Sequence, residues 1–180
     1  LHDGIGACIC GMPALGQPLV VQEGCPVVAH TKGLLALAFS PCGQRLATGG
    51  KDHTVILWDA QTGEAAHRMT GHSKIVTTLS FSADGARLAS GSVDKSVRIW
   101  DVASGALLRT IPDAHTNFVR VHFSPTNNRN IVTAGSHQVA LWDVDTGERI
   151  RIAGGRDFAV FSSDGRTIAT TNSAYDVVLL

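Results

Sequence analysis

The sequence repeats itself with a period of 42 residues. Each copy closes with a Trp-Asp pair, and the tryptophans Trp58, Trp100 and Trp142 lie 42 residues apart. A Phe-Ser pair stands 19 residues before each tryptophan, and a fourth Phe-Ser pair begins at Phe161. Self-similarity at a fixed period of about 40 residues is the mark of a repeat architecture, in which each copy is one supersecondary unit that buries its apolar faces against its neighbours.

Each copy predicts four short strands rather than helices. In the second copy, a β-rich run ends at a Ser-Ala-Asp-Gly turn, and two further turns separate three more short runs. The expected strands are 75–81, 87–90, 96–102 and 106–111. The third strand has apolar residues on both faces, with Val97 and Ile99 on one and Trp100 on the other. A sheet that is buried on both faces must lie between neighbouring sheets, so the fold class is all-β with sheets stacked in a ring.

Composition narrows the class of protein further. The chain has 180 residues, 44% of them hydrophobic, which excludes disorder as the main state. Its apolar runs are only a handful of residues long, so the sequence predicts no membrane-spanning helix. Its formal net charge is +0, which argues against nucleic-acid binding. The irregularly spaced Cys8, Cys10, Cys25 and Cys42 match no metal pattern and indicate unpaired thiols in a reducing compartment.

The period, the Gly-His or Ala-His pairs, the Phe-Ser turns and the closing Trp-Asp pairs resemble the WD40-repeat family. The resemblance implies a β-propeller, a closed ring of typically 4–8 four-stranded antiparallel blades. It covers residues 29–180, with blades expected at about 29–70, 71–113, 114–152 and 153–180; residues 1–28 are interpreted as a preceding strand or a linker. We expect a partial propeller of about three and a half to four blades, as a fragment of a seven-bladed ring. An oligomer that completes the ring is the alternative.

The resemblance also implies a buried structural tetrad in each blade, running from a Trp indole to a hydroxyl, an imidazole and a carboxylate. A Ser, a His and an Asp could instead indicate a hydrolase, but no Gly-x-Ser-x-Gly elbow surrounds Ser90, and the set occurs in more than one copy. We therefore interpret the set as structural. The implied members are His30, Thr48, Asp52 and Trp58 in the first copy, His72, Ser90, Asp94 and Trp100 in the second, and His115, Thr133 and Trp142 in the third.

The third and fourth copies depart from this pattern. In the third, the turn before the tryptophan is one residue short, and Ser136 or His137 stands where Asp is expected. In the fourth, the His is missing, Ala174 occupies the Asp position, and Leu180 occupies the Trp position. We expect an incomplete tetrad in the third copy and a degenerate fourth blade that stops within its third strand.

Partner-binding residues of this family are implied on two sets of loops that form one rim of the ring. One set follows each tetrad His, and the other contains the tetrad Asp. The candidates are Lys32, Lys74, Ile75, Asn117, Phe118 and Arg120 in the first set, and Lys51, Val93 and Lys95 in the second. If the basic side chains point the same way, they favour an acidic peptide or phosphopeptide. The simpler alternatives are that Ile75 and Phe118 begin buried strands and that the lysines are merely solvated.

The function expected from this resemblance is a non-catalytic scaffold that binds partner proteins or peptides on the rim. A regulatory or docking segment of a larger multidomain enzyme, such as a kinase, is the alternative. We expect no enzymatic activity, no cofactor and no metal site, because the remaining histidines show no ligand spacing. Histone-tail binding and a central-channel enzyme stay open as minor readings, and self-association is expected if the segment exists alone. The expected location is the cytoplasm or the nucleus.

Overall fold

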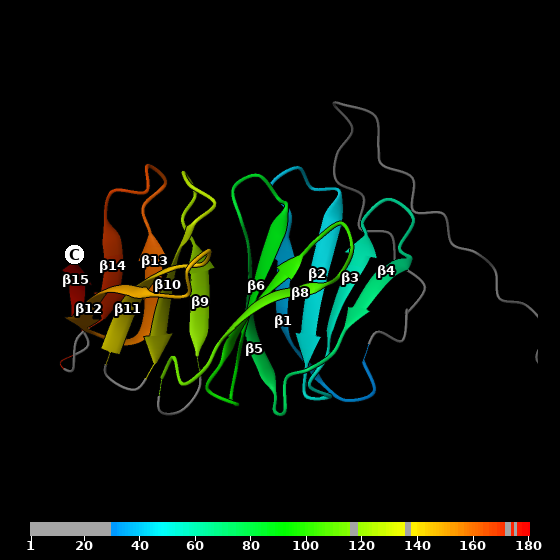
Figure 1. Ribbon diagram of the computed structural model, residues 1–180, viewed down its shortest axis with the longest axis horizontal. Helices are drawn as coiled ribbons and strands as arrows, with labels where there is room; N and C mark the ends of the chain where they lie inside the picture. Colours follow the sequence, from blue (N-terminus) through cyan, green and yellow to red (C-terminus); the bar gives the residue numbers. More distant parts are fainter. Residues whose placement is uncertain (1–29, 116–118, 136–137, 172–173, 175) are drawn as a thin grey trace, which may run out of the picture.

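The protein is a stack of small antiparallel β-sheets (Figure 1). A computed structural model describes residues 30–115, 119–135, 138–171, 174 and 176–180. Within these residues the strands form three four-stranded sheets and one three-stranded sheet. Their bounds are β1 Leu34–Phe39, β2 Arg45–Gly50, β3 Val55–Asp59 and β4 Ala65–Met69; β5 Val76–Phe81, β6 Arg87–Ser92, β7 Val97–Asp101 and β8 Leu107–Ile111; β9 Arg120–Phe123, β10 Asn130–Gly135, β11 Gln138–Asp143 and β12 Arg149–Gly154; and β13 Arg156–Phe161, β14 Ile168–Thr171 and β15 Val177–Leu179.

Within every sheet, each strand pairs with the next strand along the chain. The register repeats from sheet to sheet. In each of the first three sheets, the tryptophan pairs with an aliphatic residue of the preceding strand: Leu46 with Trp58, Leu88 with Trp100, and Ile131 with Trp142. In the fourth sheet, Ile168 and Leu180 exchange backbone hydrogen bonds of 3.0 and 2.8 Å, so Leu180 occupies the same structural position.

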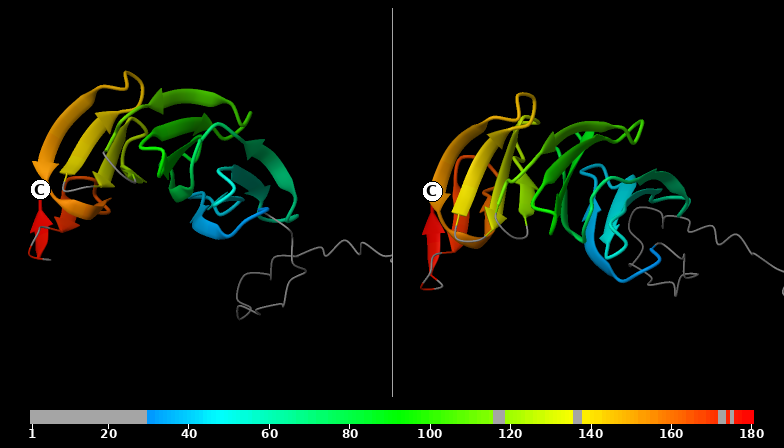
Figure 2. Two further views of the ribbon diagram at one scale, coloured as in Figure 1. Left: turned by 90° about the horizontal axis from the view of Figure 1, so that it is seen from below. Right: turned by 60° about the horizontal axis from the view of Figure 1, so that its bottom comes forward.

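The sheets stack face to face along an arc (Figure 2). The first strands of successive sheets are neighbours, with β1 against β5, β5 against β9, and β9 against β13. Three buried apolar clusters fill the junctions between consecutive sheets. The chain is therefore an all-β partial propeller, and the predicted four-stranded antiparallel blade is confirmed in the first three sheets.

The turn between the first and second strands differs in length between the second and third blades. Ser82 donates its backbone N–H to the Arg87 carbonyl at 3.0 Å, and Gly85 adopts φ = 73° inside this turn. Glycine suits that left-handed conformation because it has no Cβ. In the third blade the corresponding bond runs from Ser124 to Asn130, so this turn is one residue longer. The sequence spacing from Thr133 to Trp142 is one residue shorter than that from Ser90 to Trp100.

One predicted blade limit falls inside a strand. β12 ends at Gly154, beyond the expected limit at 152, and β13 begins at Arg156. The expected strand or linker at 1–28 lies outside the described residues. No helix of the described chain is long and apolar enough to cross a membrane.

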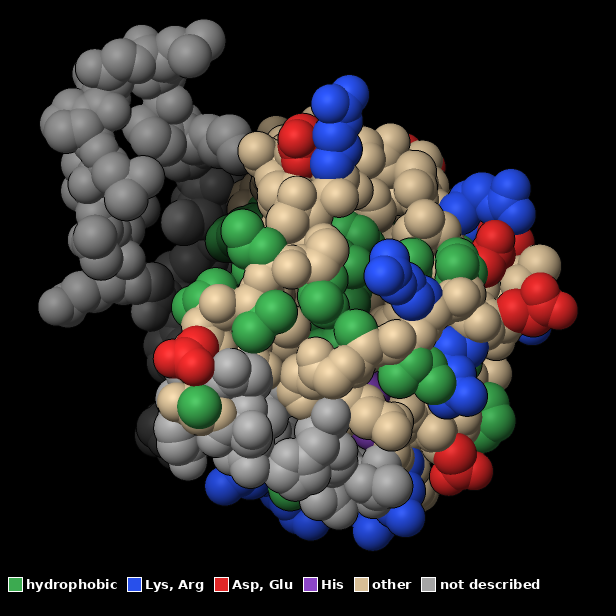
Figure 3. Space-filling view, turned by 90° about the vertical axis from the view of Figure 1, so that its left-hand side faces the viewer, with side chains coloured by type: hydrophobic (Ala, Val, Ile, Leu, Met, Phe, Trp, Pro, Cys, Tyr) green, Lys and Arg blue, Asp and Glu red, His purple; other side chains and the backbone are tan. Residues whose placement is uncertain are grey.

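Both ends of the arc present apolar sheet faces. On β1, alternating residues Leu35, Leu37 and Phe39 are 49%, 62% and 65% exposed. At the other end, hydrophobic side chains gather over the face of the fourth sheet (Figure 3); they include Phe158, Val160, Val177 and Leu179. These faces carry the same kinds of side chain that pack between sheets inside the arc.

Candidate functional site

A hydrogen-bonded chain of four side chains crosses the second blade. The Trp100 indole donates to the Ser90 hydroxyl at 2.8 Å, and that hydroxyl lies 2.8 Å from Nε2 of His72. On the other side of the ring, Nδ1 of His72 lies 2.8 Å from Asp94 Oδ2. One assignment of protons satisfies every group: Nδ1–H donates to the carboxylate and Nε2 accepts from the hydroxyl.

Burial and hydrogen bonding hold this chain in one charge state. Burial by itself would raise the Asp94 pKa, but hydrogen bonds from Ser96 and His72 lower it to about 2. Burial also lowers the pKa of His72, and the Asp94 carboxylate offsets only part of that effect. At neutral pH the imidazole is therefore neutral and the carboxylate is charged.

The first blade contains the same arrangement. Trp58 donates to the Thr48 hydroxyl at 2.9 Å, and His30 lies 2.8 Å from both that hydroxyl and the Asp52 carboxylate. Burial alone would raise the Asp52 pKa, but hydrogen bonds from His30 and Thr54 hold it well below its usual value. Two successive blades thus have complete and equivalent chains.

A fifth residue, which the sequence interpretation missed, joins each complete chain. Thr54 donates its hydroxyl to Asp52 at 2.9 Å, and Ser96 donates to Asp94 at 2.6 Å. Backbone N–H groups of Thr31 and Ser73 bond the second carboxylate oxygens, each at 3.0 Å. The signal was available in the sequence, because a hydroxyl residue follows each tetrad Asp at the second position.

In the third blade the chain is shorter. Trp142 donates to Thr133 at 2.8 Å, and Thr133 lies 2.9 Å from His115 Nε2. Among the described residues no carboxylate reaches the His115 ring, and Ser136 and His137 lie outside them. Burial lowers the His115 pKa, so this imidazole is neutral as well.

The fourth blade retains only the hydroxyl. Thr170 occupies the position of Ser90 but donates to the Phe158 carbonyl at 2.9 Å. Ala174, at the expected Asp position, is exposed. A buried hydroxyl without a Trp or His partner is satisfied here by the backbone, as buried polar groups generally are.

This buried hydrogen-bonded chain can act as a structural brace between two loops. Ser90 and Thr133 are fully buried, so a substrate cannot reach either hydroxyl. Nucleophilic catalysis needs an accessible nucleophile beside its base. A fully satisfied buried network instead fixes the elements that it joins. Here it joins the loop before β5 to the turn between β6 and β7.

These braced loops carry the candidate rim residues. A backbone hydrogen bond of 2.8 Å runs from Lys51 to Gly33, and one of 2.9 Å runs from Val93 to Ile75, so the two loop sets lie side by side in the first and second blades. Four lysines on them are exposed: Lys32, Lys51, Lys74 and Lys95.

The remaining rim candidates are placed differently. Ile75 and Val93 are half-buried. The Arg120 guanidinium lies 4.2 Å from the centre of the Phe158 ring and is half-buried, so it packs toward the fourth sheet. Asn117 and Phe118 lie outside the described residues.

The opposite edge of the sheets holds a separate polar network. The Asp of each Trp-Asp pair accepts backbone N–H bonds within its own turn, as Asp143 does from Asp145 and Thr146 at 2.8 and 3.0 Å. Arg87 of the second blade reaches Asp145 of the third at 2.6 Å, and Arg129 pairs with Asp145 at 3.1 Å. This network links neighbouring blades. The described residues contain no group of three or more His, Cys, Asp or Glu side chains that could hold a metal ion.

An arc of braced, four-stranded antiparallel blades defines a repeat protein of the β-propeller class. The model of the WD40 family, described as WD domain, G-beta repeat, matches residues 23–59, 63–101 and 105–143, and the chain belongs to this family. Among curated proteins, Protein Mut11 of Chlamydomonas reinhardtii is 59% identical over 34 residues. That alignment covers 19% of this chain and 9% of Mut11, so the chain spans only a small part of the length of that relative.

Proposed function

We propose that this chain is a non-catalytic interaction module that binds partner proteins or peptides on its lysine-bearing rim. WD40 repeats generally mediate protein–protein interactions and are typically non-catalytic. The braced blades supply rigidity, because the tetrad holds each pair of rim loops together. A rigid platform lowers the entropy cost of ordering the binding surface when a partner arrives.

The observation that carries the proposal is the charge of the rim. Lys32, Lys51, Lys74 and Lys95 are exposed, and none forms an ion pair with a carboxylate of the described residues. Asp52 and Asp94, which lie on the same loops as Lys51 and Lys95, are turned inward onto histidines. The rim therefore presents unneutralised positive charge, which favours acidic or phosphorylated peptides.

A peptide array tests this proposal. Peptides with one common apolar centre and flanking residues that vary from acidic to basic are probed with the full chain. We expect preferential retention of the acidic peptides, which weakens as salt increases. Reversal of all four lysines to glutamate should abolish that preference without lowering the melting temperature. Equal retention of acidic and basic peptides, or retention that the reversal leaves intact, would contradict the proposal.

The alternative is a docking segment within a larger enzyme. It would use the same rim residues and differs only in being joined to a catalytic domain. A catalytic domain in the same natural polypeptide would favour it. We place either function in the cytosol or nucleus, where the exposed thiol of Cys42 would stay reduced.

A further inference from the structure

An arginine starts from the apolar junction between the first and second sheets. Arg98 is the second residue of β7 after the turn at the rim, and it pairs with the tetrad residue Ser90 on β6. Trp100 lies two positions further along β7, so it shares the face of Arg98. That face packs against the first sheet, since Trp100 belongs to the same buried cluster as Leu57 and Met69.

The matching position in the first and third blades is apolar. Ile56 holds it in the first blade and Ala140 in the third, and their side chains are 0% and 3% exposed. Arg98 is half-buried. A cation that is partly removed from water is costly unless an acceptor compensates it, whereas an aliphatic side chain has no such cost. Stability alone therefore does not account for an arginine here.

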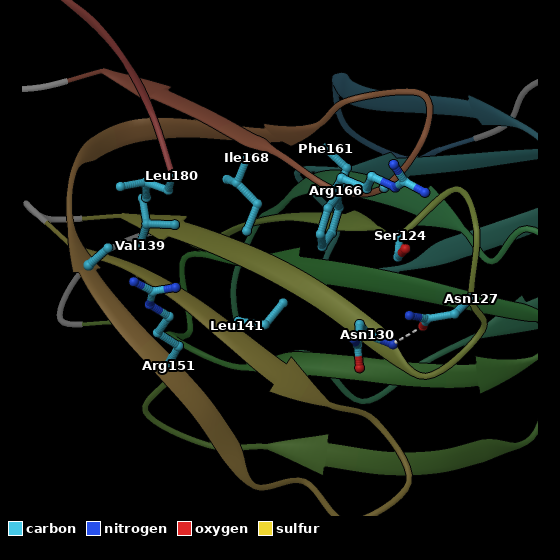
Figure 4. Close-up of a pocket in the computed structure, with 12 residues that line it drawn as sticks. Ser124, Asn127, Asn130, Val139, Leu141, Arg151, Phe161, Arg166, Ile168 and Leu180 are labelled. Atoms are coloured by element: carbon cyan, nitrogen blue, oxygen red, sulfur yellow. Dashed lines mark hydrogen bonds between the residues drawn. The ribbon is translucent and has the colours of Figure 1, made fainter.

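The guanidinium of Arg98 has a donor that the described part of the chain does not satisfy. Its Nε is shielded from solvent and has no hydrogen-bond partner there. Arg98 also takes part in none of the ion pairs among the described residues. Arg151 and Arg166, which lie at a hollow between the third and fourth sheets (Figure 4), are exposed instead, so water can serve their donors. A shielded donor without an acceptor costs about 1–3 kcal/mol.

Gly71 makes room for this guanidinium. A Cβ at Gly71 would collide with Nη1 of Arg98 and would lie 3.0 Å from Cζ. Among the first three copies of the repeat, glycine and arginine occur together only in the second; the corresponding pairs are Ala29 with Ile56 and Ala114 with Ala140. Gly71 is thus matched to Arg98, and the guanidinium lies against the backbone of the loop that leads to Lys74.

Positive charge is not cancelled at this part of the rim. Lys74 follows Gly71 by three residues and is exposed. The carboxylate of Asp94 is occupied by His72 and Ser96. Burial lowers the pKa of His72, and the charge of Arg98 adds to that effect. The field of the guanidinium therefore reaches the tetrad.

We propose that Arg98 binds the phosphate group of a phosphorylated serine or threonine in a partner peptide that lies on the rim. A phosphate monoester carries about −1.5 to −2 charges at pH 7, which matches Arg98 and Lys74 together better than a carboxylate does. A planar guanidinium can also donate two parallel N–H bonds to phosphate oxygens. This inference rests on the proposed rim function and deepens it, because it names the anion and the residue that selects it.

Three peptides test the selectivity. The probe is acetyl-Ala-phosphoserine-Ala-amide; acetyl-Ala-Glu-Ala-amide carries a carboxylate instead, and acetyl-Ala-Ser-Ala-amide carries no charge. Each is titrated into the full, nitrogen-15-labelled chain, and the Nε–H signal of Arg98 and the amide signal of Gly71 are followed by NMR. We expect the phosphopeptide to shift both signals to saturation, the glutamate peptide to bind about tenfold more weakly, and the serine peptide to cause no shift.

Variants of the chain place the binding. Arg98→Met removes the donors and keeps an apolar stem, so it should abolish the Gly71 shift without lowering the melting temperature. Arg98→Lys keeps the charge but loses the paired donors, and it should weaken phosphopeptide binding at least about fivefold. Arg151→Met, the matched control, removes the same charge from an exposed position of the third blade. It should change the affinity for the phosphopeptide by less than about twofold.

Three results would overturn the proposal. They are an Arg98 Nε–H signal that does not respond to the phosphopeptide, equal affinities for the phosphoserine and glutamate peptides, and a Gly71 shift that persists in Arg98→Met. Failure of the rim proposal looks different. The array would then show no preference for acidic peptides, while the phosphopeptide still shifts the Arg98 signal. An acidic preference in the array without a response at Arg98 would contradict the phosphate site alone.

Discussion

Nδ1 of His72 lies 2.8 Å from Oδ2 of Asp94, and the two side chains are only 1% and 7% exposed. This one contact ties the loop that carries Lys74 to the turn that carries Lys95. His30 and Asp52 make the equivalent contact between the loops of Lys32 and Lys51. The buried brace and the exposed candidate binding surface are therefore two sides of the same loops.

Removal of this brace should be costly. Asp94→Ala removes the carboxylate that accepts the buried His72 Nδ1–H and leaves only the Ser96 hydroxyl, at 3.4 Å, so we expect a loss of about 2–3 kcal/mol in the free energy of unfolding. Urea denaturation followed by tryptophan fluorescence measures this loss. Glu148→Ala, which removes an exposed carboxylate, serves as the control and should change stability by less than about 0.5 kcal/mol. Equal midpoints for the two variants would show that the His72–Asp94 contact contributes little.

Stability should fall as the solution becomes mildly acidic. Burial lowers the pKa of His72, His115 and His122 below the value of an unfolded histidine. The unfolded chain therefore binds more protons once the pH drops below about 6.5, so stability is complete above that pH and is lost below it. Each of these histidines contributes a slope of up to about 1.4 kcal/mol per pH unit until its folded-state pKa is reached.

Thermal melts between pH 8 and pH 5 measure this effect. We expect a level melting temperature from pH 8 to 7 and a steady decrease below pH 6.5. Asp94 adds a second loss only near pH 4 to 2, because its pKa is lowered to about 2. A melting temperature that stays constant to pH 5 would contradict the buried, neutral state of the three histidines.

A methyl group at Gly91 should separate the second and third blades. A Cβ at this position would lie 2.5 Å from the Val119 carbonyl oxygen and 2.6 Å from Thr78 Cγ2. Since backbone cannot move aside easily, Gly91→Ala should destabilise the protein by about 1–3 kcal/mol. The matched change Gly154→Ala meets no atom within 4 Å and should be close to neutral. Differential scanning calorimetry of the two variants decides, and similar melting temperatures would contradict the close approach of these blades.

The Asp145 network should contribute much less to stability than its number of arginines suggests. Asp145 is 39% exposed, and its partners Arg87 and Arg129 are 31% and 62% exposed. Pairs of this kind are screened by solvent and contribute about 0–1 kcal/mol each at most. Asp145→Ala should lower the free energy of unfolding by about 1 kcal/mol or less, with the difference shrinking in 0.5 M salt. A loss above about 3 kcal/mol that salt does not reduce would show that the network is effectively buried.

The repeat made the fold predictable, and its local irregularities limited the prediction. Period and strand-forming runs indicated the blades, and the register of Trp58 and Trp100 follows from them directly. The longer Ser124–Asn130 turn was not foreseen, because a residue gained in one turn and lost in the next leaves the 42-residue spacing unchanged. Copy-by-copy comparison of the sequence placed Leu180 at the tryptophan position, and its backbone pairing with Ile168 agrees with that assignment.

The position of the Arg120 side chain could not be predicted from the sequence. Packing in the fold decides whether such a long side chain extends into solvent or lies against a neighbouring ring, as Arg120 does against Phe158. In contrast, the burial of β3 and β7 on both faces followed from the apolar residues at successive positions of these strands.

The position of a bound acidic peptide tests the central claim most directly. Backbone amide shifts of the full chain are recorded while the acidic peptide that the array retains best is added. The account predicts shifts concentrated at residues 32–33, 51–53, 74–75 and 93–95, which disappear when the four lysines are reversed. Shifts concentrated instead on the turns of Asp59 and Asp101, at the opposite edge of the blades, would contradict it.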